Sequence, residues 1–373
     1  MKSKGALLWE PGTRSGWSVE DIEVHPPKEG EVLIKLAASG LCHSDDHVDT
    51  GDVTIDFAPF LGGHEGAGVI QEVGPGVKDL HEGDHCVLAF IPACGHCHWC
   101  FDGRSNLCDM GEFVMSGLWP DGTKRITARD QGVGAMSMLG TFSQYIVAPA
   151  ASVIKIDKDI SLRAATLVGC GVPTGYGSAV HIAETRPGDT VVVVGVGGVG
   201  INAVQGARIA GAEKIVAVDP VEFKRDKARE FGATHVAASV EEAFDLLGEL
   251  TGGVMADKAI ITVGIGDPAL IEGVVQLISK GGIVVHTSAA PMTVAQVDLG
   301  LFAFAMFEKQ IRGTVFGGCN PHNDIPKLLD LYRAGTLKLD ELATNTYQLE
   351  DINQGYTDMR EGRSLRGLIL YDD

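Results

Sequence analysis

Four cysteines lie close together in the first third of the chain and could bind a metal ion. They follow the spacing C-x2-C-x2-C-x7-C, as Cys94, Cys97, Cys100 and Cys108. Four thiolates can hold one zinc ion in a closed tetrahedral site, which serves structure because no position remains for a substrate. His96 and His98 lie in the same loop, but the thiols already fill four positions. We therefore expect a structural zinc site with both imidazoles facing solvent.

A second set of metal-binding side chains is scattered along the sequence, as Cys42, His64 and Cys170. Each lies beside glycines, in SGLC, LGGHEG and VGCG, which let a metal ion and a substrate approach the backbone. A catalytic zinc takes three protein ligands and leaves its fourth position open. No local spacing joins these residues, so they alone are a weaker signal than the four cysteines. Glu65 follows His64 directly and could serve as an alternate ligand or support one.

A glycine-rich turn follows the apolar run VVVVG. Gly195, Gly197, Gly198, Val199 and Gly200 fit the pattern G-x-G-x-x-G between a predicted strand and a predicted helix. The first glycine permits a tight turn, the second lets the backbone approach a pyrophosphate, and the third lets helix and strand pack closely. The pyrophosphate would bind at the positive end of the helix. This context predicts a dinucleotide site.

Asp219 ends the next predicted strand and indicates which dinucleotide is bound. A carboxylate at this position can accept hydrogen bonds from both hydroxyls of the adenosine ribose and would repel a 2′-phosphate. NAD is therefore favoured over NADP. Lys224 and Arg225 follow closely and could soften that preference.

The elements that must position these groups fall into two classes. Up to about residue 172, short apolar runs alternate with glycine turns, which predicts a β-rich domain with a loop-like stretch over 94–140. Beyond it, strands alternate with helical segments, which predicts a doubly wound parallel sheet. The final helix and strand cannot form a core of their own, so we expect them to return to the first domain. The predicted domains are 1–172 with 318–373, and 173–317.

Composition narrows the classes of function. The 373 residues are 45% hydrophobic and carry a formal net charge of −19. So acidic a surface disfavours nucleic acids, including a zinc-ribbon role for the four cysteines, and also anionic membranes. The N-terminus lacks the apolar run of a signal peptide. We expect a cytoplasmic protein whose eight cysteines stay reduced and whose partners are small molecules and other subunits.

Taken together, these motifs resemble the zinc-dependent medium-chain alcohol dehydrogenases of the liver type over nearly the whole chain. The stretches that carry the resemblance are GLCHSDDH, GGHEGAG, the four-cysteine lobe, LVGCGVPTGYGSAV, VGVGGVG, AVDPVEFKR, GTVFGG and SLRGLILY. AVDPVEFKRDKA and FGGCNPHNDIPKLL are similar to the bacterial nicotinoprotein (NDMA-dependent) alcohol dehydrogenases, which retain NAD through turnover and use an external electron acceptor. The resemblance implies an α/β protein with a GroES-like β-rich catalytic domain and a Rossmann cofactor domain.

The resemblance also implies roles for single residues. The three scattered ligands would hold the catalytic zinc with Glu65 behind it, and the four cysteines a second zinc. Ser44 would hydrogen-bond the substrate hydroxyl, His47 would carry its proton to solvent, and Asp45 would orient His64. Asp46 keeps no role, and we expect it to be solvated. Besides the glycine turn and Asp219, the implied cofactor contacts are His43, Thr174, Lys224, Val263 and Arg366. Many relatives have arginine at the position of His43. Phe90 would line the substrate pocket.

The implied reaction oxidises a primary alcohol to an aldehyde by hydride transfer to NAD. An alternative is a thiol-dependent formaldehyde dehydrogenase, whose substrate would favour a cationic patch that this acidic chain does not obviously provide. A non-catalytic zinc- and NAD-binding protein is an alternative of another class. The apolar run at 299–307 predicts a buried helix. The family resemblance implies that the nearby RGTVFG extends a sheet between two chains. The protein would then be a homodimer or homotetramer.

Overall fold

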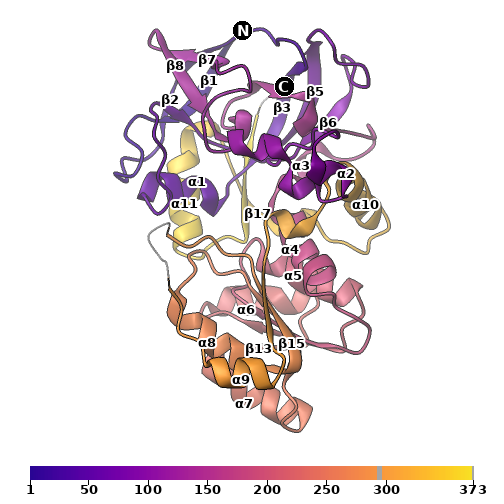
Figure 1. Cartoon of the computed structure of the whole chain (residues 1–373). Helices are drawn as coiled ribbons and strands as arrows, with labels where there is room; N and C mark the ends of the chain where they lie inside the picture. Colours follow the sequence, from indigo (N-terminus) through magenta and orange to yellow (C-terminus); the bar gives the residue numbers. More distant parts are fainter. Residues whose placement is uncertain (292–295, 372–373) are drawn as a thin grey trace. The chain divides into compact units, whose positions relative to one another are not determined.

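A computed structural model describes residues 1–291 and 296–371. The chain divides into two compact units, Met1–Cys170 with Asn320–Asp373, and Gly171–Cys319. We call them unit 1 and unit 2 (Figure 1). The functional domain boundaries near 172 and 318 stay a prediction. Within the described ranges, no helix is long and apolar enough to cross a membrane.

Unit 1 contains a closed barrel of short strands. Its order is β1 (Lys2–Leu8), β2 (Ser18–Val24), β7 (Ile126–Ala128), β8 (Gln131–Ala135) and β4 (Phe60–Leu61). Strands β7 and β8 lie in the stretch that we expected to be loop-like, so that expectation is wrong there. Both are short, and they gain their order from partners far away in the sequence, β2 and β4.

A second sheet of unit 1 carries the candidate metal ligands at one end. Its order is β10 (Val153–Ile156), β6 (His85–Leu88), β5 (Gly66–Val73), β3 (Glu31–Gly40), β18 (Arg366–Leu370) and β17 (Ala343–Tyr347), while β9 (Tyr145–Pro149) also pairs with β3. Strand β18 runs antiparallel to β3. The C-terminal segment therefore joins the first part of the chain, as the sequence predicts.

Helices of unit 1 connect and cover these strands. They are α1 (His43–Thr50), α2 (His98–Phe101), α3 (Leu162–Thr166), α10 (Pro321–Arg333) and α11 (Ile352–Arg360). Helix α1 starts three residues after β3 ends, so the sheet itself sets where that helix begins. Helix α11 packs against β17 and β18.

Unit 2 is built on a parallel sheet. Its order is β13 (His235–Ala237), β12 (Lys214–Val218), β11 (Thr190–Val194), β14 (Ala256–Ile261), β15 (Ile278–His286) and β16 (Gln310–Gly313). All five residues of β11 are buried, as a continuous apolar run predicts. The strand order reverses direction at β11, which is the point where doubly wound sheets bind ligands.

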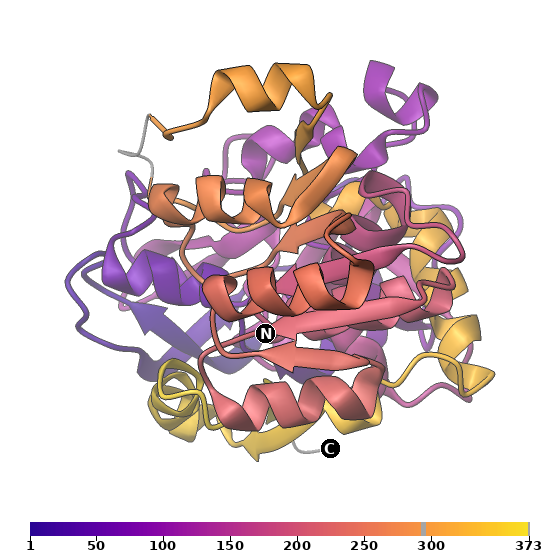
Figure 2. The same cartoon turned by 90° about the horizontal axis from the view of Figure 1, so that it is seen from below.

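Helices cover both faces of this sheet (Figures 1 and 2). The helices of unit 2 are α4 (Gly171–Gly177), α5 (Gly200–Ile209), α6 (Glu222–Phe231), α7 (Val240–Thr251), α8 (Pro268–Gln276) and α9 (Leu301–Met306), of which α9 has no buried residue. Helix α5 packs beside α6, and α7 packs beside α8. Val192 and Val194 of β11 share a core with Ala243 of α7 and Val274 of α8.

Helix α9 differs from its prediction. We expected a buried helix, but Leu301, Phe302 and Met306 are 72%, 80% and 61% exposed. The helix has only six residues and no buried position, and β16 is the last strand at its edge of the sheet. The apolar run therefore forms surface in the single chain.

Candidate active site

The scattered metal ligands converge in unit 1. Cys42, His64, Glu65 and Cys170 each offer one ligand atom, and these atoms all lie within 4.8 Å of one another. Strands β3 and β5 pair antiparallel through Ser39 and Gly66, so residues just after β3 and just before β5 meet at one end of the sheet. Cys170 follows a short helical turn, Leu167–Gly169, that packs against β5 and β6.

Glycines next to these ligands allow the close packing. Gly63 has φ +89°, and a Cβ there would lie 2.5 Å from Thr141 Oγ1. A Cβ on Gly169 would lie 2.5 Å from the carbonyl oxygen of Leu88. A side chain at either position would therefore push His64 or Cys170 out of place.

Charged groups around the cluster favour a bound cation. His64 Nδ1 lies 3.0 Å from Asp45 Oδ2, and both side chains are buried. Burial lowers the pKa of His64, but the negative charges of Asp45 and Cys42 outweigh it and raise that pKa well above its ordinary value. The thiol of Cys170 donates to Cys42, which lowers the pKa of Cys42 and raises that of Cys170. A zinc ion would replace these shared protons.

Glu65 is fully buried and forms an ion pair with Arg366. Burial raises the pKa of Glu65 to about 7, against the opposing effect of Arg366. Its Oε1 has no hydrogen-bond partner among the described residues. Two thiols, an imidazole and a buried carboxylate with an unsatisfied oxygen fit a zinc site.

Arg366 also donates a hydrogen bond to the carbonyl oxygen of Leu41 at 3.3 Å, and it is only 4% exposed. We expected this guanidinium to face the ribose and phosphates of the cofactor. The structure pairs it with Glu65 instead, and its role towards the cofactor stays a prediction.

Helix α1 carries Ser44 and His47, the other predicted catalytic side chains. Ser44 Oγ lies 3.6 Å from Cys42 Sγ, so a hydroxyl adjoins the metal ligands. The rings of His43 and His47 lie 6.1 Å apart on the same helix. Phe90 packs edge-on to His64 at 5.6 Å. The roles of these residues stay predictions.

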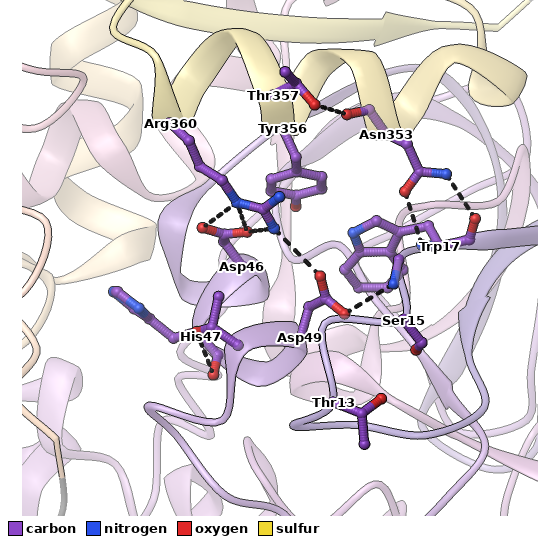
Figure 3. A network of polar contacts seen from close by, with 12 residues as sticks. Thr13, Ser15, Trp17, Asp46, His47, Asp49, Asn353, Tyr356, Thr357 and Arg360 are labelled. Carbon is purple, nitrogen blue, oxygen red and sulfur yellow. Dashed lines mark hydrogen bonds and ion pairs between the residues drawn. The ribbon is translucent and has the colours of Figure 1, made fainter.

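Asp46 is not solvated, so that expectation is wrong. It is 5% exposed and forms an ion pair with Arg360 of α11, which also reaches Asp49 Oδ2 at 3.2 Å. Figure 3 shows Arg360 between the two carboxylates. Asn353 of α11 in turn holds the backbone of Trp17 by two hydrogen bonds of 2.8 Å. These contacts fix α1 against α11 and the N-terminal segment.

Sequence reasoning missed Asp49, Asp52 and Arg360. Arg360 lies 314 residues from Asp46, and no local motif joins them. The sequence signal for Asp52 is its place directly after Gly51, five residues beyond His47 and outside the predicted catalytic stretch.

The four-cysteine lobe also forms a compact cluster. The ligand atoms of Cys94, Cys97, Cys100 and Cys108 lie within 4.8 Å of one another. The backbone N–H of Asp109 lowers the pKa of Cys97 to about 6, while burial raises that of Cys108 to about 12. His96 and His98 are exposed, as predicted. Four convergent sulfur atoms fit a closed zinc site.

The glycine turn of unit 2 joins β11 to α5. Gly195 has φ +86°, and a Cβ on Gly200 would overlap the carbonyl oxygen of Gly195. These positions therefore require glycine for the turn and for close packing. A Cβ on Gly197 meets nothing within 4 Å, so the backbone there is open to a ligand. Gly198 and Val199 complete the turn, and Gly200 begins α5.

Asp219 lies beside this turn, where the backbone N–H of Val196 donates to Oδ2 at 3.0 Å and that of Val221 to Oδ1 at 2.9 Å. Each oxygen keeps a lone pair that could accept from a ribose hydroxyl. Thr174 Oγ1 is buried without a hydrogen-bond partner in the described chain. Unit 2 also holds Lys224 and Val263, whereas His43 and Arg366 belong to unit 1.

Comparison with known proteins identifies two families along the chain, and the second match extends past unit 2 into the residues that return to unit 1. Residues 28–158 match the family described as alcohol dehydrogenase GroES-like domain, and residues 198–334 match the zinc-binding dehydrogenase family. The chain is 52% identical to alcohol dehydrogenase B of Mycobacterium tuberculosis over 100% of this chain and 99% of the relative. It is 51% identical to the NDMA-dependent alcohol dehydrogenase of Amycolatopsis methanolica, with the same coverage. The resemblance stated from the motifs is confirmed.

A solved structure shares the fold throughout. The benzyl alcohol dehydrogenase of Acinetobacter calcoaceticus is 28% identical, with a TM-score of 0.92 and complete coverage of both chains. The expected pairing of a GroES-like and a Rossmann part is therefore confirmed.

Proposed function

Because the chain belongs to the zinc-dependent medium-chain alcohol dehydrogenase family, we propose that it oxidises a primary alcohol to an aldehyde with NAD as hydride acceptor. The observation that carries this proposal is the convergence of Cys42, His64 and Cys170 with the Ser44 hydroxyl beside them. When bound, zinc lowers the pKa of the alcohol and NAD accepts the hydride. Ser44 hydrogen-bonds the substrate hydroxyl, and His47 takes up the proton that the alcohol loses.

We further propose that each subunit holds two zinc ions. Cys42, His64 and Cys170 would hold the first, with Glu65 as alternate ligand, and the four-cysteine lobe the second. In unit 2, the backbone of the glycine turn and the start of α5 would bind the pyrophosphate, and Asp219 would bind the adenosine ribose.

Retention of NAD through turnover is part of the proposal. Its support is the similarity to a relative named as NDMA-dependent. Such an enzyme would pass the hydride from its retained cofactor to an external acceptor before the next alcohol binds. The exposed apolar α9 and the edge strand β16 support an oligomer joined at that edge. A cytoplasmic location stays a prediction.

The test uses desalted protein without added nucleotide. Addition of a primary alcohol such as benzyl alcohol should produce the absorption band of reduced nicotinamide, and Cys42→Ser should abolish it. If turnover requires added NAD, the retention of NAD is contradicted, but the proposed oxidation of alcohols is not. Formaldehyde oxidation that depends on an added thiol, without oxidation of simple alcohols, would instead identify the thiol-dependent alternative.

A further inference from the structure

A carboxylate that the proposed reaction does not use lies against His47. Asp52 Oδ2 is 3.4 Å from Nδ1 of the imidazole, a long hydrogen bond of the kind common before a substrate binds. The His47 side chain is 5% exposed and that of Asp52 is 29% exposed. The pair therefore links a buried ring to a group that reaches solvent.

The end of α1 places Asp52 there. The helix ends at Thr50, and Gly51 adopts φ +84° and turns the chain back. The backbone N–H groups of Gly51 and Val53 both donate to the carbonyl oxygen of His47, at 3.1 and 3.0 Å. Gly51 also packs closely on Gly12, because a Cβ on Gly51 would lie 3.2 Å from the Cα of Gly12. The position of Asp52 is thus a consequence of a constrained turn.

The hydrogen bonds around Asp52 determine which nitrogen of His47 carries a proton. The hydroxyl of Thr50 donates to Asp52 Oδ2 at 2.6 Å, and this bond, together with His47, lowers the pKa of Asp52. Asp52 is therefore ionised near neutral pH and can only accept hydrogen bonds. The facing nitrogen, Nδ1, must donate, which leaves Nε2 of a neutral ring as the acceptor.

We propose that Asp52 is a positioning residue that holds His47 in its Nδ1-protonated form, so that Nε2 is the nitrogen that takes up the proton of the alcohol. The inference rests on the proposed function. The Nε2 atom would take up the proton that the alcohol loses, which makes the ring an imidazolium, while bound NAD would accept the hydride. Asp52 stabilises that cation through Nδ1–H until the proton is released to water.

Other charged groups surround this pair. The His43 ring lies 6.1 Å from His47. Asp46 and Asp49, on the same helix, are paired with Arg360. Arg14 lies close enough to lower the pKa of Asp52 further. Any pH profile of His47 contains the effects of these groups, so the test compares variants that leave them unchanged.

The test compares Asp52→Asn and Asp52→Glu with Asp56→Asn, which removes the same charge from an exposed position four residues away. The first readout is the pair of ring ¹⁵N shifts of His47 in histidine-labelled protein, assigned by their loss in His47→Gln. We expect the Nδ1-protonated pattern in wild type, Asp56→Asn and Asp52→Glu, and a mixed or Nε2-protonated pattern in Asp52→Asn. This readout requires no turnover.

The second readout is the rate of alcohol oxidation as a function of pH. Since a general base is worth about 10²–10⁴-fold, we expect loss of its orienting partner to lower kcat about tenfold while KM stays within about twofold. Asp52→Glu should recover most of kcat. Thr50→Val, which removes the second donor to Asp52, should cause a smaller loss and provides a test if Asp52→Asn does not fold.

Two results separate the inference from the proposed function. If wild type oxidises alcohols but Asp52→Asn matches Asp56→Asn in both ring shifts and pH profile, the role of Asp52 is overturned. If no alcohol is oxidised but the ring shifts change as expected, the proposed function fails while the positioning of His47 by Asp52 is supported.

Discussion

Arg360 offers the sharpest test of how α1 is held. Its guanidinium neutralises Asp46 and Asp49, whose side chains are 7% and 3% exposed. Breaking a buried ion pair by removing one partner costs about 3–5 kcal/mol, because the remaining charge is buried without compensation. Arg360 itself is 42% exposed, so solvent screens part of the interaction. We therefore expect Arg360→Met to lower the free energy of unfolding by about 2 kcal/mol.

The assay is thermal unfolding of the whole protein. For a domain of about 150–250 residues, 2 kcal/mol corresponds to a decrease in Tm of about 4–8 °C. Lys4→Met is the matched control, because it breaks an ion pair with Glu350 in which the side chains are 60% and 57% exposed. That change should cost under about 1 kcal/mol.

A double variant tests the mechanism directly. Asp46→Asn combined with Arg360→Met removes a buried charge together with its partner. The free energy of unfolding should therefore fall less in the double variant than the sum of the decreases in the two single variants. Equal Tm values for Arg360→Met and Lys4→Met would refute the reasoning. Strict additivity in the double variant would show that Arg360 acts through packing rather than charge.

Three further predictions concern the metal and cofactor sites. Gly200→Ala should fold poorly because its Cβ overlaps the carbonyl oxygen of Gly195. In protein stripped of nucleotide, Gly197→Ala should keep the wild-type Tm but bind NAD more weakly by calorimetry. In chelator-treated protein, the raised pKa of Glu65 means that the folded state binds the proton more tightly, so stability in urea should fall as pH rises from about 4.5 to about 7. Glu65→Gln should lack that slope, and an unchanged slope would contradict the assignment. Cys97→Ser should release one zinc ion per subunit, measured by elemental analysis, and retention of both would exclude a four-cysteine site.

Much of the fold could be predicted because its signals are local. The strand β11 is a run of buried valines, and Gly195 to Gly200 lies between a strand and a helix in the sequence itself. The four cysteines are close enough in sequence to form one site. Cys42, His64 and Cys170 are distant from one another, but adjacent glycines and the family resemblance identified them. In each case the residues that come together are either close in the sequence or part of a recognisable motif.

The expectations that failed depend on tertiary context. The strands β7 and β8 are too short for their own periodicity to predict them, and pairing with β2 and β4 creates them. The exposure of α9 depends on whether another element covers its apolar residues. The sequence of the helix alone cannot predict this.

The stretch CHSDDH illustrates the same limit within a site. Its six residues include two aspartates side by side, whose chemistry is identical in the sequence. Asp45 faces His64, whereas Asp46 faces Arg360 of a helix near the other end of the chain. Successive helical residues point about 100° apart, so adjacent carboxylates must meet different surroundings. Their roles differ because α1, which follows β3, lies between the metal ligands on one side and α11 on the other. The same helix places His47 against Asp52.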